Sequence, residues 1–213
     1  MHFENLYGIK IDWEKPVITL DVNQIALKNP TCWPAGLPQL EYNYFKTEQL
    51  ELCVTPTTSG ELTCWKDIND VKIGSRTYDR FKKSQLFKSR PDHARANFSS
   101  LEAEAVWNQL RQILWPTDKF LTRNQFHDVS QLYFHTVASG CIANSCFATL
   151  DHNFLNKKDA IQGELGVSVM TPEQAWNHYQ PKFALYAPSS EECLSVWNAQ
   201  NEYFSQLEQE ASN

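Results

Sequence analysis

Short apolar runs recur along the chain, and two of them end at an aspartate. VITL, residues 17–20, is apolar or β-branched at every position before Asp21, and CFATL, residues 146–150, precedes Asp151. Runs without polar alternation are typical of strands that are covered on both faces, as in parallel sheets. With LELCVT and VSVM, these runs predict four strands, within residues 17–21, 50–55, 146–150 and 167–170.

Longer segments with apolar residues at helical spacing separate these runs. The clearest are SSLEAEAVWNQLRQILWP, TRNQFHDVSQLYFHTVASG and APSSEECLSVWNAQNEYFSQLEQEASN, the last of which begins as a linker. They predict three amphipathic helices, within residues 99–116, 122–140 and 187–213. The apolar face expected for the second helix consists of Phe126, Val129, Tyr133 and Val137.

Helix start signals place two shorter helices. One is expected to begin near Leu37, with Pro38 in its first turn. Thr171 can cap another that begins at Pro172, because Gln174 is spaced to reach back and complete a capping box.

The order of these elements defines the fold class. Strands alternate with helices, and a further helix is expected near Thr58, which predicts an α/β protein with a parallel sheet between helical layers. A chain of 213 residues, 42% of them hydrophobic, has enough apolar material for one packed domain with appendages.

The charge of the chain is unevenly distributed. The net charge of -6 is not that of a typical nucleic-acid binder, yet residues 76–95 contain seven Lys or Arg and two Asp. This segment is either a solvated basic connection or a contact for single-stranded nucleic acid, in which interleaved aromatic residues such as Phe87 stack on bases. The cations considered for that contact are Arg76, Arg80, Lys82, Lys83, Lys88 and Arg90.

Targeting signals and cysteine spacing indicate a cytoplasmic protein. The first residues include Glu4, Asp12 and Glu14 and form no signal peptide, and no stretch approaches the roughly 18 apolar residues of a membrane span. The six cysteines include no Cys-x-x-Cys pair, so reduced thiols are expected rather than a zinc site or a redox dithiol.

Four acidic residues are candidates for a shared site. Asp21 and Asp151 follow predicted strands, Glu61 comes shortly after the strand within 50–55, and Asp128 lies early in the helix that leads to the strand at 146–150. Ligands bind beyond the carboxyl ends of parallel strands, so these acids are expected to converge there. Because crowded carboxylates repel one another, a hard divalent cation, Mg²⁺ or Mn²⁺, would stabilise the cluster and could serve phosphodiester hydrolysis.

Each acid also has a purely structural alternative. Asp21 can cap a following helix, and Glu61 can complete a capping box. Asp128 can be a solvent-facing residue that the positive N-terminus of its helix favours, and Asp151 can be a turn residue. Three upstream acids are alternatives to Glu61, namely Glu41, Glu48 and Glu51. His127 and His135, which share the helix of Asp128, are expected to be ordinary helix histidines, because their spacing does not suit a zinc site.

Five successive motifs resemble those of the PIN-domain nuclease family. They are VITLDVNQIAL, VTPTTSGEL, FHDVSQLYFHTVASG, CFATLDHNFL and GVSVMTPEQAW, and the similarity covers residues 17–65 and 120–178. The resemblance implies a three-layer α/β/α sandwich, Mg²⁺ or Mn²⁺, and endoribonuclease activity. It assigns metal binding to four acids and hydrogen-bonding support to their neighbours: Asp21, Glu61, Asp128 and Asp151, with Asn23, Thr149 and Asn153.

The same resemblance divides the chain and suggests partners. Residues 1–180 form the PIN-like domain, with a divergent insertion at about 66–119, and residues 181–213 form a linker and C-terminal helix. RNA is the expected substrate, and an antitoxin-like inhibitor and a homodimer are the protein partners considered. The main alternative is a catalytically inactive PIN-like binding or scaffold protein. An aspartyl-phosphate phosphatase is disfavoured, because Asn23 stands where that chemistry would require its second aspartate.

Overall fold

The protein has a five-stranded sheet in which every pair of neighbouring strands is parallel, in the order β3-β2-β1-β4-β5. The computed structural model describes residues 12–21, 24–25, 33–55, 83–84, 86–89, 100–139 and 144–210. Its strands are β1 (Val17–Leu20), β2 (Glu51–Val54), β3 (Lys88–Ser89), β4 (Ser145–Ala148) and β5 (Ser168–Met170). The α/β class and the parallel sheet predicted from the sequence are therefore confirmed.

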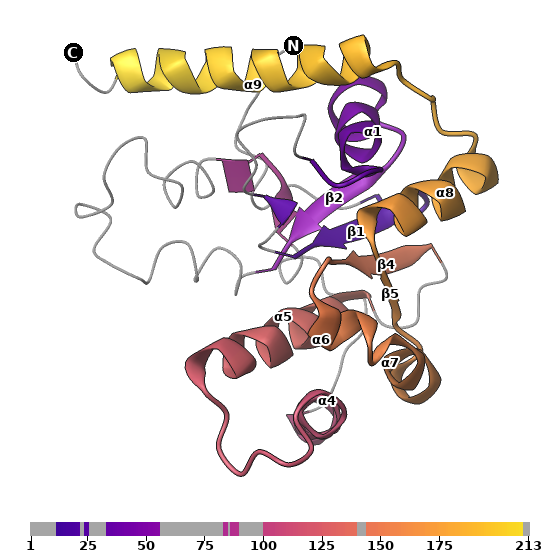
Figure 1. Ribbon diagram of the computed structural model, residues 1–213, viewed down its shortest axis with the longest axis vertical. Helices are drawn as coiled ribbons and strands as arrows, with labels where there is room; N and C mark the ends of the chain where they lie inside the picture. Colours follow the sequence, from indigo (N-terminus) through magenta and orange to yellow (C-terminus); the bar gives the residue numbers. More distant parts are fainter. Residues whose placement is uncertain are drawn as a thin grey trace.

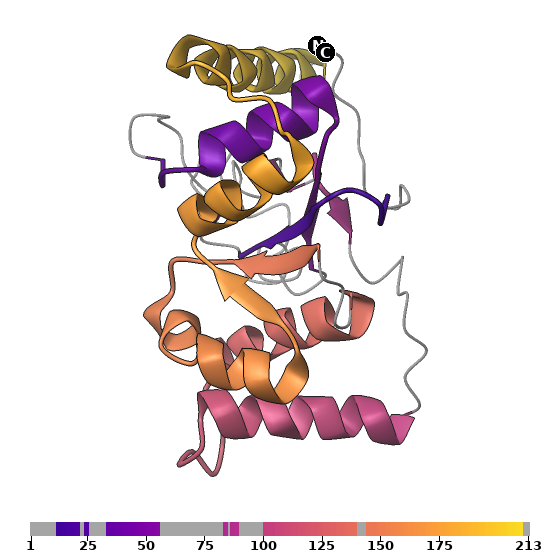
Figure 2. The same cartoon turned by 90° about the vertical axis from the view of Figure 1, so that its right-hand side faces the viewer.

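Helices cover both faces of the sheet, in an arrangement compatible with a three-layer α/β/α fold (Figures 1 and 2). On one face lie α1 and α8, with α9 packed over α1, and on the other lie α5 and α7, with α4 outside them. The helical segments are α1 (Leu37–Tyr42), its π-helical continuation η3 (Asn43–Thr47), α4 (Ser100–Leu114), α5 (Arg123–Ser139), α6 (His152–Leu155), α7 (Lys158–Leu165), α8 (Pro172–Phe183) and α9 (Ser190–Glu210).

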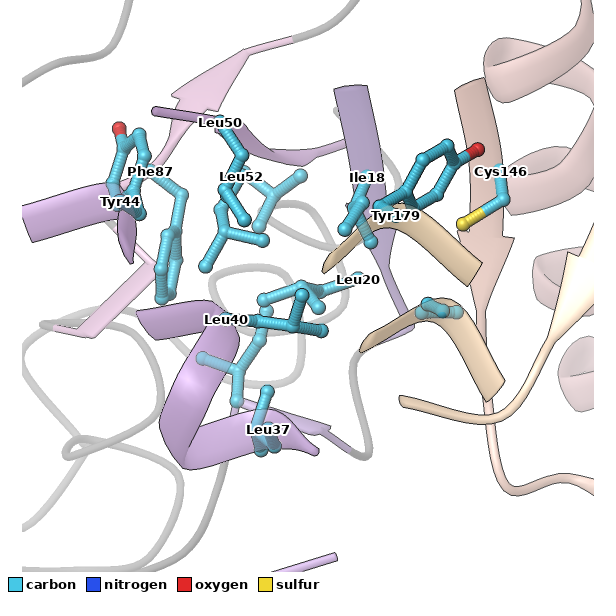
Figure 3. Close-up of a cluster of buried hydrophobic side chains, with 14 of the residues drawn as sticks. Ile18, Leu20, Leu37, Leu40, Tyr44, Leu50, Leu52, Phe87, Cys146 and Tyr179 are labelled. Carbon is cyan, nitrogen blue, oxygen red and sulfur yellow. The ribbon is translucent and has the colours of Figure 1, made fainter. Parts of the chain in front are cut away.

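The central strands are buried along their whole length. All four residues of β1, β2 and β4 are buried, as expected for continuous apolar runs with helices on both sides. Side chains alternate between the faces, so that Ile18 and Leu20 point toward the α1 and α8 layer, where Tyr179 packs (Figure 3). Phe147 belongs to the second apolar cluster, on the opposite face with α4, α5 and α7.

Helix α8 begins with the predicted capping box. The Thr171 hydroxyl accepts a hydrogen bond from Gln174 N at 3.1 Å, and Gln174 Oε1 accepts one from Thr171 N at 3.0 Å. The start of α8 lies against Gly36, which precedes α1 and has a φ of +87°. A Cβ atom on Gly36 would lie 2.5 Å from the carbonyl oxygen of Pro172, so only glycine fits this approach.

One predicted helix face differs from the structure. Phe126 was expected to be buried on α5, but it is 51% exposed. Its ring lies 5.1 Å from that of Trp107 on α4, whereas Val129 and Leu132 pack with Phe147 of the sheet. The physical reason is that α5 packs against the sheet on one side and against α4 on the other, so its apolar residues do not all face the sheet. Phe126 lies on the α4 side.

The segment expected to be an insertion contributes directly to the fold. Helix α4 lies within residues 66–119 and packs against α5 and α7, and β3 adds a strand beside β2. The helix expected near Thr58 and the capping residue Ser99 lie outside the described residues. Within the described part of the chain, no helix combines the length and apolar character that crossing a bilayer requires.

Candidate functional site

The strand order creates a switch point between β1 and β4. From β1 the chain builds outward through β2 to β3, whereas β4 and β5 extend the sheet on the other side. In open α/β sheets, ligands bind outside the carboxyl ends of the strands at such a point. Asp21 follows β1 there and donates its backbone N–H to the carbonyl oxygen of Ala148, the last residue of β4, over 3.0 Å. Asp21 is 2% exposed.

Thr149 joins the ends of the two strands. Its Oγ1 donates a hydrogen bond to Asp21 Oδ2 over 2.7 Å and accepts one from the backbone N–H of Asp151 over 2.9 Å. Its own backbone N–H donates to the carbonyl oxygen of Met170 on β5 over 2.9 Å. The hydroxyl that the family resemblance assigns to support therefore contacts one candidate acid directly and fixes the backbone of another.

Asp151 caps the short helix α6. Its Oδ1 accepts a hydrogen bond from Asn153 N over 2.7 Å, which explains why the chain turns from β4 directly into a helix. Asp151 therefore has a structural role in the fold, as the alternative to metal binding requires. Capping does not exclude ligand binding, because a carboxylate has two oxygens and about four lone-pair sites.

Asp128 comes from α5 and is electrostatically coupled to both strand-end acids. Its pKa is raised from 3.8 to about 7, first because burial removes solvent from its carboxylate and then because the negative charges of Asp151 and Asp21 repel its ionised form. Three of the four predicted acids therefore influence one another from β1, α5 and the end of β4.

The three acids do not form a completed ligand sphere. Among the residues that the structure describes, no three His, Cys, Asp or Glu side chains are close enough together to hold a metal ion. Charge repulsion acts over longer distances than the roughly 2.1 Å of a Mg²⁺–oxygen bond, so both findings are compatible. The donor set, carboxylate oxygens in a negatively charged site, fits Mg²⁺ or Mn²⁺ in its chemistry.

The remaining predicted site residues divide into those outside the described residues and those placed by the structure. The first group consists of Asn23, Glu61, Arg76, Arg80, Lys82 and Arg90. Asn153 is exposed, and its backbone N–H donates to Asp151. Lys88 lies on β3, where it is the parallel partner of Cys53.

Two members of the predicted basic contact are buried instead of facing solvent. Lys83 is 6% exposed, and its Nζ lies 2.6 Å from Glu41 Oε1 and 4.3 Å from the centre of the Trp33 ring. Phe87 is fully buried and packs beside Tyr44. The alternative in which Phe87 stacks on nucleic acid is excluded, because a ring in the core has no face available to a base.

The alternatives to Glu61 occupy other parts of the molecule. Glu41 pairs with Lys83, and Glu48 follows η3 with a φ of 53°. Glu51 is the first residue of β2 and pairs with Val17, so it lies at the amino-terminal ends of the strands, whereas Asp21 lies at their carboxyl-terminal ends. There its Oε1 accepts a hydrogen bond from Asp12 N over 3.0 Å.

Two polar residues near the site were not identified from the sequence. Thr19 Oγ1 and His135 Nδ1 are hydrogen-bonded over 2.9 Å in the layer between β1 and α5. The available signal was spacing, because Thr19 is two residues before Asp21 on the strand and His135 is seven after Asp128 on the helix.

An open cavity of about 360 Å³ lies beside the edge strand β5. Its lining includes Lys158, Ser168, Met170, Gln174 and His178, and it includes none of Asp21, Asp128 and Asp151. Its link to the acids is Met170, whose carbonyl oxygen accepts the hydrogen bond from Thr149 N.

No protein-family model, curated protein or solved structure matches this chain. The strand order and the geometry of the acids are therefore the basis for assigning a function.

Proposed function

We propose that this protein is a PIN-like, metal-dependent endonuclease that hydrolyses phosphodiester bonds in RNA. The observation that carries the proposal is that Thr149 links Asp21 to Asp151 at the switch point of a parallel sheet, while burial and the charges of these two acids raise the pKa of Asp128 to about 7. A partly buried carboxylate beside two further negative charges is unfavourable alone, and a divalent cation is the simplest ligand that reverses this.

Asp21, Asp128 and Asp151 would hold Mg²⁺ or Mn²⁺, with Glu61 as the fourth acid that the family resemblance implies. The ion, when bound, supplies a Lewis acid that stabilises charge on a phosphoryl oxygen and promotes attack by water. Thr149 orients the Asp21 carboxylate through its 2.7 Å hydrogen bond. Because Asp128 is half-protonated near pH 7, the ion must displace a proton from it in part of the molecules.

RNA would reach the acids across the carboxyl edge of the sheet. The basic residues Arg76, Arg80, Lys82, Lys88 and Arg90 remain proposed contacts for its phosphates, whereas Lys83 is removed from that set by its pairing with Glu41. Lys158 and His178, which line the cavity beside β5, are additional proposed contacts.

The test is cleavage of a mixed single-stranded RNA pool with Mn²⁺, repeated after addition of EDTA. Asp21→Asn and Asp151→Asn should each abolish cleavage while circular dichroism shows a folded protein. Glu173→Gln removes an exposed negative charge from the first turn of α8 and is the matched control, with unchanged cleavage expected. Full activity in folded Asp151→Asn would refute the proposal.

A second candidate function is binding without catalysis. It is favoured by the finding that, in the part of the chain that the structure describes, no three potential ligands are close enough to hold an ion. Mn²⁺ discriminates the two functions, because an ion that binds only the native state raises the unfolding temperature. A shift that disappears in Asp21→Asn supports the nuclease, and no shift in the wild type supports the binding protein.

A further inference from the structure

A buried hydrogen bond connects α5 to the central strand behind the acids. His135 Nδ1 and Thr19 Oγ1 are 2.9 Å apart, His135 is 1% exposed and Thr19 is fully buried. The His135 ring also meets Phe147 of β4 edge-on, with centroids 5.7 Å apart. His135 thus contacts the two strands whose ends bear Asp21 and Asp151.

The spacing of this pair matches the spacing of the acids. Thr19 lies on β1 and Asp21 comes directly after this strand, so the alternation of side chains puts both on the same face of the sheet. Asp128 and His135 are seven residues apart on α5, which is close to two helical turns and gives them the same helix face. A rotation or shift of α5 that broke the Thr19–His135 bond would therefore also move Asp128 relative to Asp21.

This constraint differs in kind from the apolar packing of α5 against the sheet. Val129 and Leu132 hold α5 by apolar packing, which is not directional and tolerates small rotations. A hydrogen bond depends on both distance and angle and resists them.

We propose that Thr19 and His135 are positioning residues that fix the rotation and register of α5, so that Asp128 stays directed at the site of Asp21 and Asp151. The expected effect on cation binding rests on the proposed function, whereas the claim that Thr19 and His135 fix the position of α5 does not. Loss of a partner that hydrogen-bonds a metal ligand commonly lowers metal affinity by about 10- to 100-fold, and we expect the lower end of this range for a pair that positions the helix bearing the ligand.

The first experiment measures Mn²⁺ affinity by electron paramagnetic resonance. Thr19→Val and His135→Leu should each weaken binding at least about tenfold, and the double variant should be no weaker than the worse single one. His135→Asn, whose amide can still reach the Thr19 hydroxyl, should retain most of the affinity. Unchanged affinity in folded Thr19→Val and His135→Leu would overturn the proposal.

The matched control is Thr136→Val. Thr136 is also buried on α5, but its hydroxyl donates to the carbonyl oxygen of Leu132 in the same helix, over 2.7 Å. This substitution changes the same atoms as Thr19→Val without touching β1. This control can lose thermal stability but should keep its Mn²⁺ affinity. A loss of affinity equal to that of Thr19→Val would overturn the positioning role, because removal of a buried hydroxyl that does not join α5 to β1 would then have the same effect.

A second experiment needs no metal. The backbone amides of α5 around Asp128 should exchange with solvent faster in Thr19→Val than in the wild type, because this helix loses its directional contact with β1. The amides of α8, which lies on the opposite face of the sheet, should exchange as in the wild type. Unchanged exchange around Asp128 in folded Thr19→Val would overturn the positioning role, even if the wild type bound no Mn²⁺ and the proposed function had failed.

Discussion

Asp21 accepts a hydrogen bond from the Thr149 hydroxyl over 2.7 Å, although the two residues are 128 positions apart in the chain. The bond is possible because β1 and β4 are neighbours with Leu20 opposite Ala148, so both strands end at the same height. The hydroxyl also accepts a hydrogen bond from Asp151 N, which holds the backbone between β4 and α6 in place. One side chain therefore determines how the ends of both strands face one another.

Removal of this hydroxyl should destabilise the protein. In Thr149→Val, the buried Asp21 carboxylate loses a donor, which should lower the free energy of unfolding by about 1.5–3 kcal/mol. Thr149→Ser keeps the hydroxyl and should lose less, so urea denaturation of the two variants isolates the hydrogen bond. Equal stability of the Val and Ser variants would show that the bond contributes nothing.

The raised pKa of Asp128 makes stability depend on pH. Because its pKa of about 7 in the folded state lies above the usual 3.8, the native protein holds more protons than the unfolded chain between these values. The contribution of Asp128 to the free energy of unfolding therefore falls as pH rises from about 4 to about 7, and the loss is complete above that range. Asp128→Asn should exceed the wild type in stability at about pH 8 and match it near pH 4.

Urea titrations of both proteins across this range test the prediction. The difference in free energy of unfolding should grow with pH and level off above about 7. A difference that is the same at every pH would mean that neither burial nor the neighbouring acids raise the pKa of Asp128.

The approach of Gly36 to α8 predicts opposite effects at two glycines. Gly36→Ala requires a positive φ for alanine and puts a Cβ 2.5 Å from Pro172 O, so it should lower the free energy of unfolding by about 2–4 kcal/mol. Gly163 lies within α7, where a Cβ would meet nothing within 4 Å. Gly163→Ala should raise the free energy of unfolding by about 0.5–1 kcal/mol, and thermal denaturation of the two variants compares these effects. A neutral Gly36→Ala would contradict the close packing.

The buried Lys83–Glu41 pair predicts a strongly non-additive result. Lys83→Met leaves the Glu41 carboxylate buried without its cation and should lower the free energy of unfolding by about 3–5 kcal/mol. Adding Glu41→Gln removes the isolated charge while Gln200 can still donate to the new amide, so the double variant should recover much of the loss. Chemical denaturation of the four proteins measures the coupling, and simple additivity would show that the pair is not closely coupled.

Local patterns predicted most of the secondary structure. The strands β1, β2, β4 and β5 were predicted within a residue or two, because continuous apolar runs are diagnostic of a sheet covered on both faces. The capping box of Thr171 and Gln174 was predicted in full, since it depends only on neighbouring residues. The shared contact of Asp21 and Asp151 with Thr149 agrees with a local rule, because the two acids follow the ends of neighbouring parallel strands.

Contacts between distant polar residues were beyond the reach of the sequence. Lys83 was grouped with solvent-facing cations, because nothing near it indicates that Glu41, 42 residues earlier, is its partner. His135 was treated as an ordinary helix residue, since its role depends on Thr19, which is 116 residues away. Polar side chains carry no signal of burial until the partner that satisfies them is known.

The pairing of β1 with β4 also determines when the acids can meet during synthesis. Val17 is the partner of Ser145, so this central pair cannot form until almost 150 residues have left the ribosome. At 5–20 residues per second, β4 follows β1 by roughly 6–26 s, during which the nascent chain contains Asp21 without its companions. The rate of translation, in addition to the equilibrium stability of the fold, therefore limits how early Asp21 and Asp151 can be brought together.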